Sequence, residues 1–123
     1  MVFVYGTLKA GGSNHHFMEG QTLVGDAQTA PGFQLIHLGS YPGMVTVPNS
    51  AESVVGEVWR IDSKCLAQLD ALEGIDEGLY RRESINLLAP FTNENVQTYL
   101  YAQSIAGRPS IPNGRWIEPT SPN

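Results

Sequence analysis

The chain has 123 residues, of which 41% are hydrophobic and 15% are charged, and its formal net charge is −5. These values are typical of one soluble globular domain and exclude an intrinsically disordered chain. Nucleic-acid surfaces require clustered Lys and Arg, so the acidic balance argues against a nucleic-acid partner. No apolar run approaches the roughly 20 residues of a membrane helix, and no signal-peptide pattern is present. The single cysteine, Cys65, excludes an internal disulfide. We therefore expect a cytoplasmic protein that does not bind membranes.

The first half of the chain predicts short strands separated by turns. Residues 2–5 are apolar or aromatic and have high β-propensity, and Gly6 then ends the strand with a residue that permits close backbone approach or a positive φ. Ser13 or Asn14 is expected to begin a short helical turn that Gly20 ends. Further strands are expected over residues 22–30, 33–37, 44–47 and 54–61, with turns at 31–32 and 48–50.

The second half contains the one convincing helix. Asp62 and Ser63 supply N-cap chemistry, leucines recur at residues 66, 69 and 72, and Gly74 follows. Two more strands are expected, over residues 80–88 and 96–102. From Gly107 onward, four prolines predict a tail that packs irregularly or stays loose. The expected organisation is thus a domain over residues 1–106 and a tail over 107–123.

Five or six short strands and one helix predict an α+β fold. We expect a mixed or antiparallel sheet that curls into a small β-barrel with helices on its flank. Regular helices do not separate the strands, which argues against a doubly wound parallel sheet.

Several common functional sites are excluded by spacing. The glycine-rich segment after the first strand matches neither the GxGxxG nor the GxxxxGK(S/T) pattern of nucleotide-binding proteins. The GxSxG motif of serine hydrolases is also absent from the sequence. His15 and His16 are adjacent and point in different directions on a helix, while His37 stands alone, so no metal site is expected. Cys65 lies in the first turn of the helix, where its thiol pKa could be lowered, although a packing role fits its position better.

Glu73 and the loop after the first strand are candidates for chemistry. A carboxylate at a helix C-terminus faces the negative end of the macrodipole, and Asp70, Asp76 and Glu77 would add repulsion if they lie close. Glu73 could then have a raised pKa and carry a proton near neutral pH; the alternative is a solvated glutamate at a frayed helix end. Likewise, the loop could present N–H donors to a ligand, or it could be an ordinary turn.

Four segments occur in a characteristic order: FVYGTLKAGGSNH, YPGMV, GEVWRID and LDALEGIDEGLYRR. Together they resemble the gamma-glutamylcyclotransferase-like family, and most closely the short gamma-glutamylamine cyclotransferase-like proteins, over roughly residues 2–101. The resemblance implies a compact mixed β-barrel with flanking helices. It also implies a cofactor-free reaction that converts a small γ-glutamyl amide into 5-oxoproline and a free amine.

The resemblance also assigns the site residues. Glu73 matches the catalytic glutamate, which would take a proton from the substrate α-ammonium and return one to the departing amine. The substrate-binding positions are Tyr5, Gly6, Thr7 and Leu8, which match the loop that holds the glutamyl group, together with Tyr80, Gly43 and the further candidate Tyr101. A non-catalytic module that binds a small molecule in the same pocket is the alternative. The leaving amine and the oligomeric state are left open by the sequence.

Overall fold

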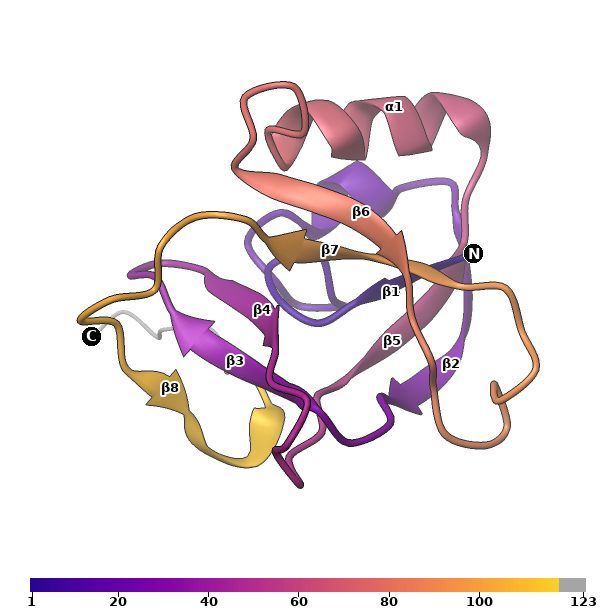
Figure 1. Cartoon of the computed structure of the whole chain (residues 1–123). Coiled ribbons are helices and arrows are strands. Elements are labelled where there is room, and N and C mark those ends of the chain that lie inside the picture. The colour runs from indigo at the N-terminus through magenta and orange to yellow at the C-terminus, as the bar shows by residue number, and fades with distance from the viewer. Residues whose placement is uncertain (118–123) are drawn as a thin grey trace, which may run out of the picture.

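The computed structural model describes residues 1–117. Its elements are β1 (Val2–Val4), η1 (His15–Met18), β2 (Thr22–Gln28), β3 (Phe33–His37), β4 (Pro42–Thr46), β5 (Val55–Arg60), α1 (Ser63–Leu72), β6 (Tyr80–Ser84), β7 (Gln97–Tyr101), β8 (Ser110–Ile111) and η2 (Pro112–Gly114). In Figure 1, α1 and η1 lie over one side of the sheet that contains β1, and β3, β4 and β8 lie on its other side.

The strands form two sheets. One has five strands in the order β2-β5-β1-β7-β6, with β1 antiparallel to β5 and parallel to β7; the other has three in the order β4-β3-β8. The α+β class is therefore confirmed. The expected barrel does not close among the described strands, because the β3–β4 hairpin pairs with β8 and not with an edge of the larger sheet.

The residues of β1 alternate between two cores, as the period of two along a strand requires. Phe3 and Tyr5 belong to the inter-sheet core, which also contains residues of β3, β4 and β5. Val2 and Val4 point to the opposite side and belong to the helix-side core, with residues of η1, α1, β6 and β7. The strand at the centre of the larger sheet is thus buried on both faces, and its C-terminal end opens between the two layers.

The helix begins and ends where the sequence predicts. The Asp62 side chain accepts a hydrogen bond from the backbone N–H of Cys65 at 2.7 Å, which satisfies one of the unpaired donors at the helix start. Leu69 is fully buried in the helix-side core. After Leu72, Glu73 is the C-cap residue and Gly74 has a φ of +65°, the left-handed conformation that commonly stops a helix.

Pairing partners set the strand boundaries, and two of the boundaries that differ from expectation show this. The strand expected over residues 80–88 ends at Ser84, which pairs with Gln97, the first residue of β7. The strand expected from residue 44 begins at Pro42, which pairs with His37, the last residue of β3. Pro42 is tolerated there because the first residue of a strand need not donate to the ladder.

The described part of the tail contributes to the fold. Ser110 and Ile111 form β8 and pair with β3, and Trp116 is buried in the inter-sheet core. An added Cβ at Gly114 would lie 1.9 Å from the Ser53 carbonyl oxygen, so the chain passes very close to another backbone segment here. Residues 109–116 therefore pack against the rest of the domain, and the end of the expected tail lies outside the described residues.

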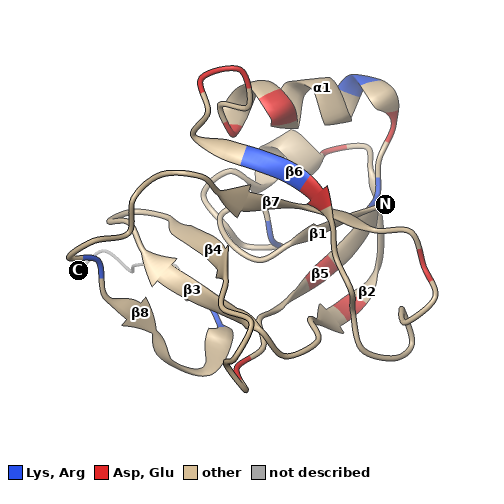
Figure 2. Ribbon diagram, viewed as in Figure 1, with Lys and Arg blue, Asp and Glu red and all other residues tan. Residues whose placement is uncertain are grey.

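Basic residues are dispersed over separate elements, as Figure 2 shows for the described segments, with Arg81 and Arg82 on β6 and others near α1 and β8. Within residues 1–117, no helix is long and apolar enough to cross a membrane.

Candidate active site

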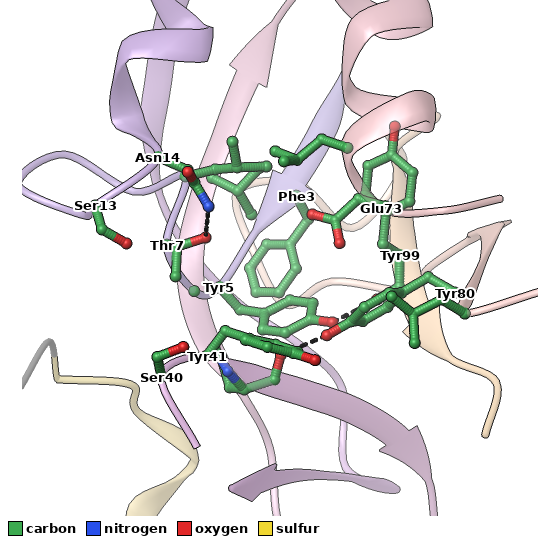
Figure 3. Close-up of a pocket in the computed structure, with 16 residues that line it drawn as sticks. Phe3, Tyr5, Thr7, Ser13, Asn14, Ser40, Tyr41, Glu73, Tyr80 and Tyr99 are labelled. Carbon is green, nitrogen blue, oxygen red and sulfur yellow. Dashed lines mark hydrogen bonds between the residues drawn. The ribbon is translucent and has the colours of Figure 1, made fainter. Parts of the chain in front are cut away.

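A pocket of about 320 Å³ lies where β1 ends and the chain enters the loop over residues 6–14. Its walls come from that loop, the segment 40–42, the end of α1, the start of β6, and Tyr99 on β7 (Figure 3). Glu73 and the segment from Gly6 to Leu8 line the same pocket, so the two candidate groups share one cavity. This volume suits a small ligand.

Hydrogen bonds hold the loop after β1 in a fixed turn. The Asn14 backbone N–H donates to the Thr7 carbonyl at 2.9 Å, and its side-chain Nδ2 donates to Thr7 Oγ1 at 3.0 Å. His15 Nδ1 lies 2.9 Å from the Leu8 carbonyl oxygen, and because a carbonyl only accepts, this nitrogen carries the hydrogen. These bonds use the carbonyls of the turn as acceptors, so the N–H groups of Gly6 to Leu8 are its candidate donors to a ligand.

Because Gly6 has no side chain, this turn can lie directly against Pro42. A Cβ at Gly6 would lie 2.7 Å from Cγ and 2.9 Å from Cδ of Pro42, closer than packed atoms approach. Gly6 is not among the glycines with positive φ. Of the two roles that the sequence allowed for this glycine, the close approach is the one present, and it brings the loop against the Pro42 wall of the pocket.

Glu73 extends from the end of α1 toward the rings of Tyr5 and Tyr80 (Figure 3). It is half-buried, and this burial raises the pKa of its carboxyl from its ordinary value to about 7. Burial is thus the cause of the raised pKa. The sequence had indicated the helix dipole and the neighbouring carboxylates as causes, but Asp76 and Glu77 are exposed. A carboxyl with this pKa exchanges a proton near neutral pH.

The raised pKa of Glu73 gives a testable dependence of stability on pH. The folded protein holds this proton more tightly than the unfolded chain, whose glutamates have a pKa of about 4.3. The free energy of unfolding should therefore carry a contribution that is fully present below about pH 4 and is lost as the pH rises through about 7. Glu73→Gln cannot ionise, so it should exceed the wild type in stability by roughly 2 kcal/mol at pH 8 and match it at pH 4. Chemical denaturation at the two pH values measures the difference; equal gaps at both would contradict the burial of Glu73.

Two buried tyrosines hold the walls of the pocket. Tyr5 donates its hydroxyl hydrogen to the Tyr99 carbonyl at 2.6 Å and accepts a hydrogen bond from the Met44 N–H at 3.1 Å. The Tyr80 hydroxyl donates to the Pro42 carbonyl at 2.8 Å. Burial raises the pKa of both phenols above their ordinary value, and the nearby Glu73 charge raises each further. Both therefore stay protonated at neutral pH, and Glu73 is the one charged side chain among the described residues that line the pocket.

The structure gathers most of the residues that the sequence assigned to substrate binding. Tyr5, Gly6, Thr7, Leu8, Glu73 and Tyr80 line the pocket, whereas Gly43 and Tyr101 do not. An added Cβ at Gly43 would lie 2.8 Å from Cβ of Tyr101, so Gly43 is pressed against β7 and Pro42 forms the wall expected at Gly43. Tyr101 instead packs edge-on against Tyr80, with ring centroids 5.3 Å apart, and supports that ring.

Sequence reasoning missed several residues of the lining. Asn14 was considered only as a helix cap, yet its side chain donates to Thr7 and makes no cap hydrogen bond. Tyr99 carries no local signal, because it reaches the pocket only through the position of β7 beside β1. Tyr41, in the segment before β4, also lines the pocket.

Cys65 and the histidines take no part in the lining. The Cys65 thiol is buried, its Sγ contacts the Phe17 carbonyl oxygen at 3.5 Å, and burial raises its pKa. The packing role therefore holds for Cys65, and the lowered thiol pKa does not. Among residues 1–117, no group of three or more His, Cys, Asp or Glu side chains is arranged to hold a metal ion.

Comparison with known proteins identifies the family. The family model described as gamma-glutamyl cyclotransferase, AIG2-like matches residues 2–118. A Vibrio cholerae protein whose name places it in this family is 39% identical over 118 residues, with 96% of each chain covered. The Gamma-glutamylcyclotransferase family protein YtfP of Escherichia coli K12 is 38% identical over 117 residues, covering 95% of this chain and 96% of YtfP.

Solved structures agree with this assignment. The solution structure of ytfP from Escherichia coli has a TM-score of 0.70, with 94% of this chain and 95% of that chain covered. The fold also matches the mouse AIG2-like protein, with a TM-score of 0.73 at 24% identity, over 99% of this chain and 97% of the other. The chain belongs to the gamma-glutamyl cyclotransferase, AIG2-like family.

Proposed function

We propose that this protein is a γ-glutamyl cyclotransferase that converts a γ-glutamyl amide into 5-oxoproline and a free amine. The observation that carries the proposal is that Glu73, with a pKa near 7, lines the same small pocket as the Gly6 to Leu8 backbone. The pocket thus combines a proton carrier with donors suited to a carboxylate or a developing oxyanion. Family membership supports the same reaction class.

The proposed reaction needs one proton carrier and a bent substrate. Ionised Glu73 takes a proton from the substrate α-ammonium, and the freed nitrogen lone pair attacks the γ-carbonyl carbon. The new C–N bond closes a five-membered ring, and Glu73 gives its proton to the departing amine as the bond to that amine breaks. The carboxylate then takes the second proton from the ring nitrogen and passes it to the amine, so the products are the neutral lactam and an ammonium ion. Because both reacting groups belong to one molecule, holding it bent supplies much of the acceleration; effective molarities of about 10⁵ M are known for well-oriented intramolecular reactions.

The polar groups of the pocket have distinct places in this reaction. The N–H groups of Gly6 to Leu8 bind the α-carboxylate or the oxyanion, while the hydroxyls of Tyr5 and Tyr80 are engaged with backbone carbonyls and hold the walls. No cationic side chain lines the pocket among the described residues, so backbone dipoles must stabilise negative charge on the substrate.

A panel of γ-glutamyl amides tests the proposal. The panel should contain amides of a small alkylamine, of the lysine ε-amine and of an α-amino acid, and 5-oxoproline release should be followed for each. We expect release from at least one amide at a rate well above that of buffer alone. The matched control is the same amide with its α-amine acetylated, which lacks the nucleophile and should be inert. If calorimetry shows binding but no amide yields 5-oxoproline, the protein is a binding module and the proposal fails.

A further inference from the structure

Asp70 lies on α1 one turn before Glu73 and bonds to two strands at once. The Tyr99 hydroxyl on β7 donates to Asp70 Oδ1 at 2.7 Å. Arg82 on β6 forms an ion pair with Asp70 through Oδ2. Both carboxylate oxygens of Asp70 are therefore bound to the sheet, and each by a different strand.

The two sheet residues are placed to act together. Arg82 and Tyr99 are directly opposite each other in the register of β6 and β7, so their side chains leave the sheet side by side. Tyr99 also accepts the Tyr5 hydroxyl hydrogen bond through its carbonyl, which joins this group to the wall of the pocket. Side-chain hydrogen bonds thus connect α1, β7 and Tyr5, the residue that follows β1.

The ion pair of Asp70 and Arg82 differs from its neighbour on the same strand. Its side chains are 30% and 28% exposed, whereas those of the Arg81–Glu83 pair are 53% and 46% exposed. Shielding from water strengthens the first pair relative to the second. Residues three apart on a helix lie on one side of it, so a force that holds Asp70 acts on the position of Glu73.

The end of α1 needs such a restraint. Glu73 is the C-cap residue, where a helix lacks further turns to support it and commonly frays. Its side chain nevertheless lines the pocket and is half-buried. We propose that Asp70, Arg82 and Tyr99 form a clamp that fixes the end of α1 on the sheet and so positions Glu73 in the pocket. The clamp is a set of positioning residues, and its catalytic consequence rests on the proposed function.

The variants Tyr99→Phe and Arg82→Gln test the clamp through the ionisation of Glu73, measured by NMR titration of its carboxyl carbon. The titratable groups that line the pocket with Glu73 are the phenols of Tyr5, Tyr41, Tyr80 and Tyr99. In each variant, release of the helix end should hydrate Glu73 and lower its pKa from about 7 to below about 6. For Arg82→Gln the electrostatic effect has the opposite sign, because losing a cation raises a carboxyl pKa. A fall in that variant therefore reports movement of Glu73.

Arg81→Gln is the matched control, because it removes the same charge from the neighbouring position on β6 and leaves the clamp intact. It should leave the pKa of Glu73 near 7. In the kinetic assay, the two clamp variants should lower kcat by about tenfold and change KM by less than about twofold, as expected for a misplaced proton carrier.

Two results would separate the clamp from the proposed function. If Tyr99→Phe and Arg82→Gln lower Tm but leave the pKa of Glu73 near 7, the three residues serve stability alone and the clamp is overturned. If the wild type releases no 5-oxoproline from any amide, the proposed function fails, and the titration still decides whether the clamp holds Glu73.

Discussion

Glu73→Gln should lower kcat for 5-oxoproline release by about two to four decades. Glutamine keeps the length and the hydrogen-bonding capacity of the side chain but cannot accept the proton of the α-ammonium or return it to the leaving amine. No second carboxylate among the described residues lines the pocket, so no neighbouring side chain can replace Glu73 as the proton carrier. Initial rates across a pH series should also show that wild-type kcat/KM rises as the pH passes through about 7, where Glu73 ionises.

Glu77→Gln is the control for the loss of Glu73, because it makes the same chemical change four residues later, at an exposed position outside the pocket lining. It should leave kcat within about twofold of the wild type, since exposed carboxylates away from the site have little effect. Circular dichroism should show that Glu73→Gln is folded, and calorimetry should show that it still binds the amide. Turnover by this variant at the wild-type rate would remove Glu73 from the mechanism.

Periodicity predicts the elements of this fold better than it predicts how they associate. The strand at residues 33–37 and the helix caps at Asp62 and Gly74 follow from local rules, and the structure has them at those positions. The barrel was inferred from the number of strands, but closure depends on which edges pair. The short pair Ser110–Ile111, hidden in a proline-rich stretch, completes the smaller sheet and leaves the two sheets separate.

The candidate site shows the same division. Residues 5–8 and Glu73 were predicted because each belongs to a segment with its own local pattern and family resemblance, and the fold brings them into one pocket. Tyr99 was missed, because its role arises from long-range pairing. Gly43 was placed one residue away from the actual wall, since alternation along β4 turns Pro42 toward the pocket and presses Gly43 against Tyr101. The cause of the raised pKa of Glu73 also could not be predicted from the sequence, because burial is a property of the packed molecule.

Gly6→Val should raise KM by roughly ten- to a hundredfold. Any Cβ at this position would lie 2.7 Å from Cγ of Pro42, and the ring of a buried proline cannot turn away as a flexible side chain would. The loop must therefore shift, which displaces the N–H groups of Gly6 to Leu8 from the carboxylate that they bind in the proposed reaction. A hydrogen bond to a charged group contributes about 1.5–3 kcal/mol, and each 1.4 kcal/mol corresponds to tenfold in affinity. Steady-state kinetics with the best amide of the panel measures the change.

Two further variants show whether the steric conflict is the cause. Gly25→Ala adds a Cβ at a glycine where the nearest atom, Cζ of Phe91, would be 3.5 Å away, so it should leave KM unchanged. Pro42→Ala removes the two ring atoms that a Cβ at Gly6 would meet, so combining it with Gly6→Ala should recover part of the affinity that Gly6→Ala alone loses. Because both substitutions touch one contact, their effects on KM should be non-additive. An unchanged KM in Gly6→Val would show that the loop does not bind the substrate, and additive losses in the double variant would show that the Pro42 contact is not what places it.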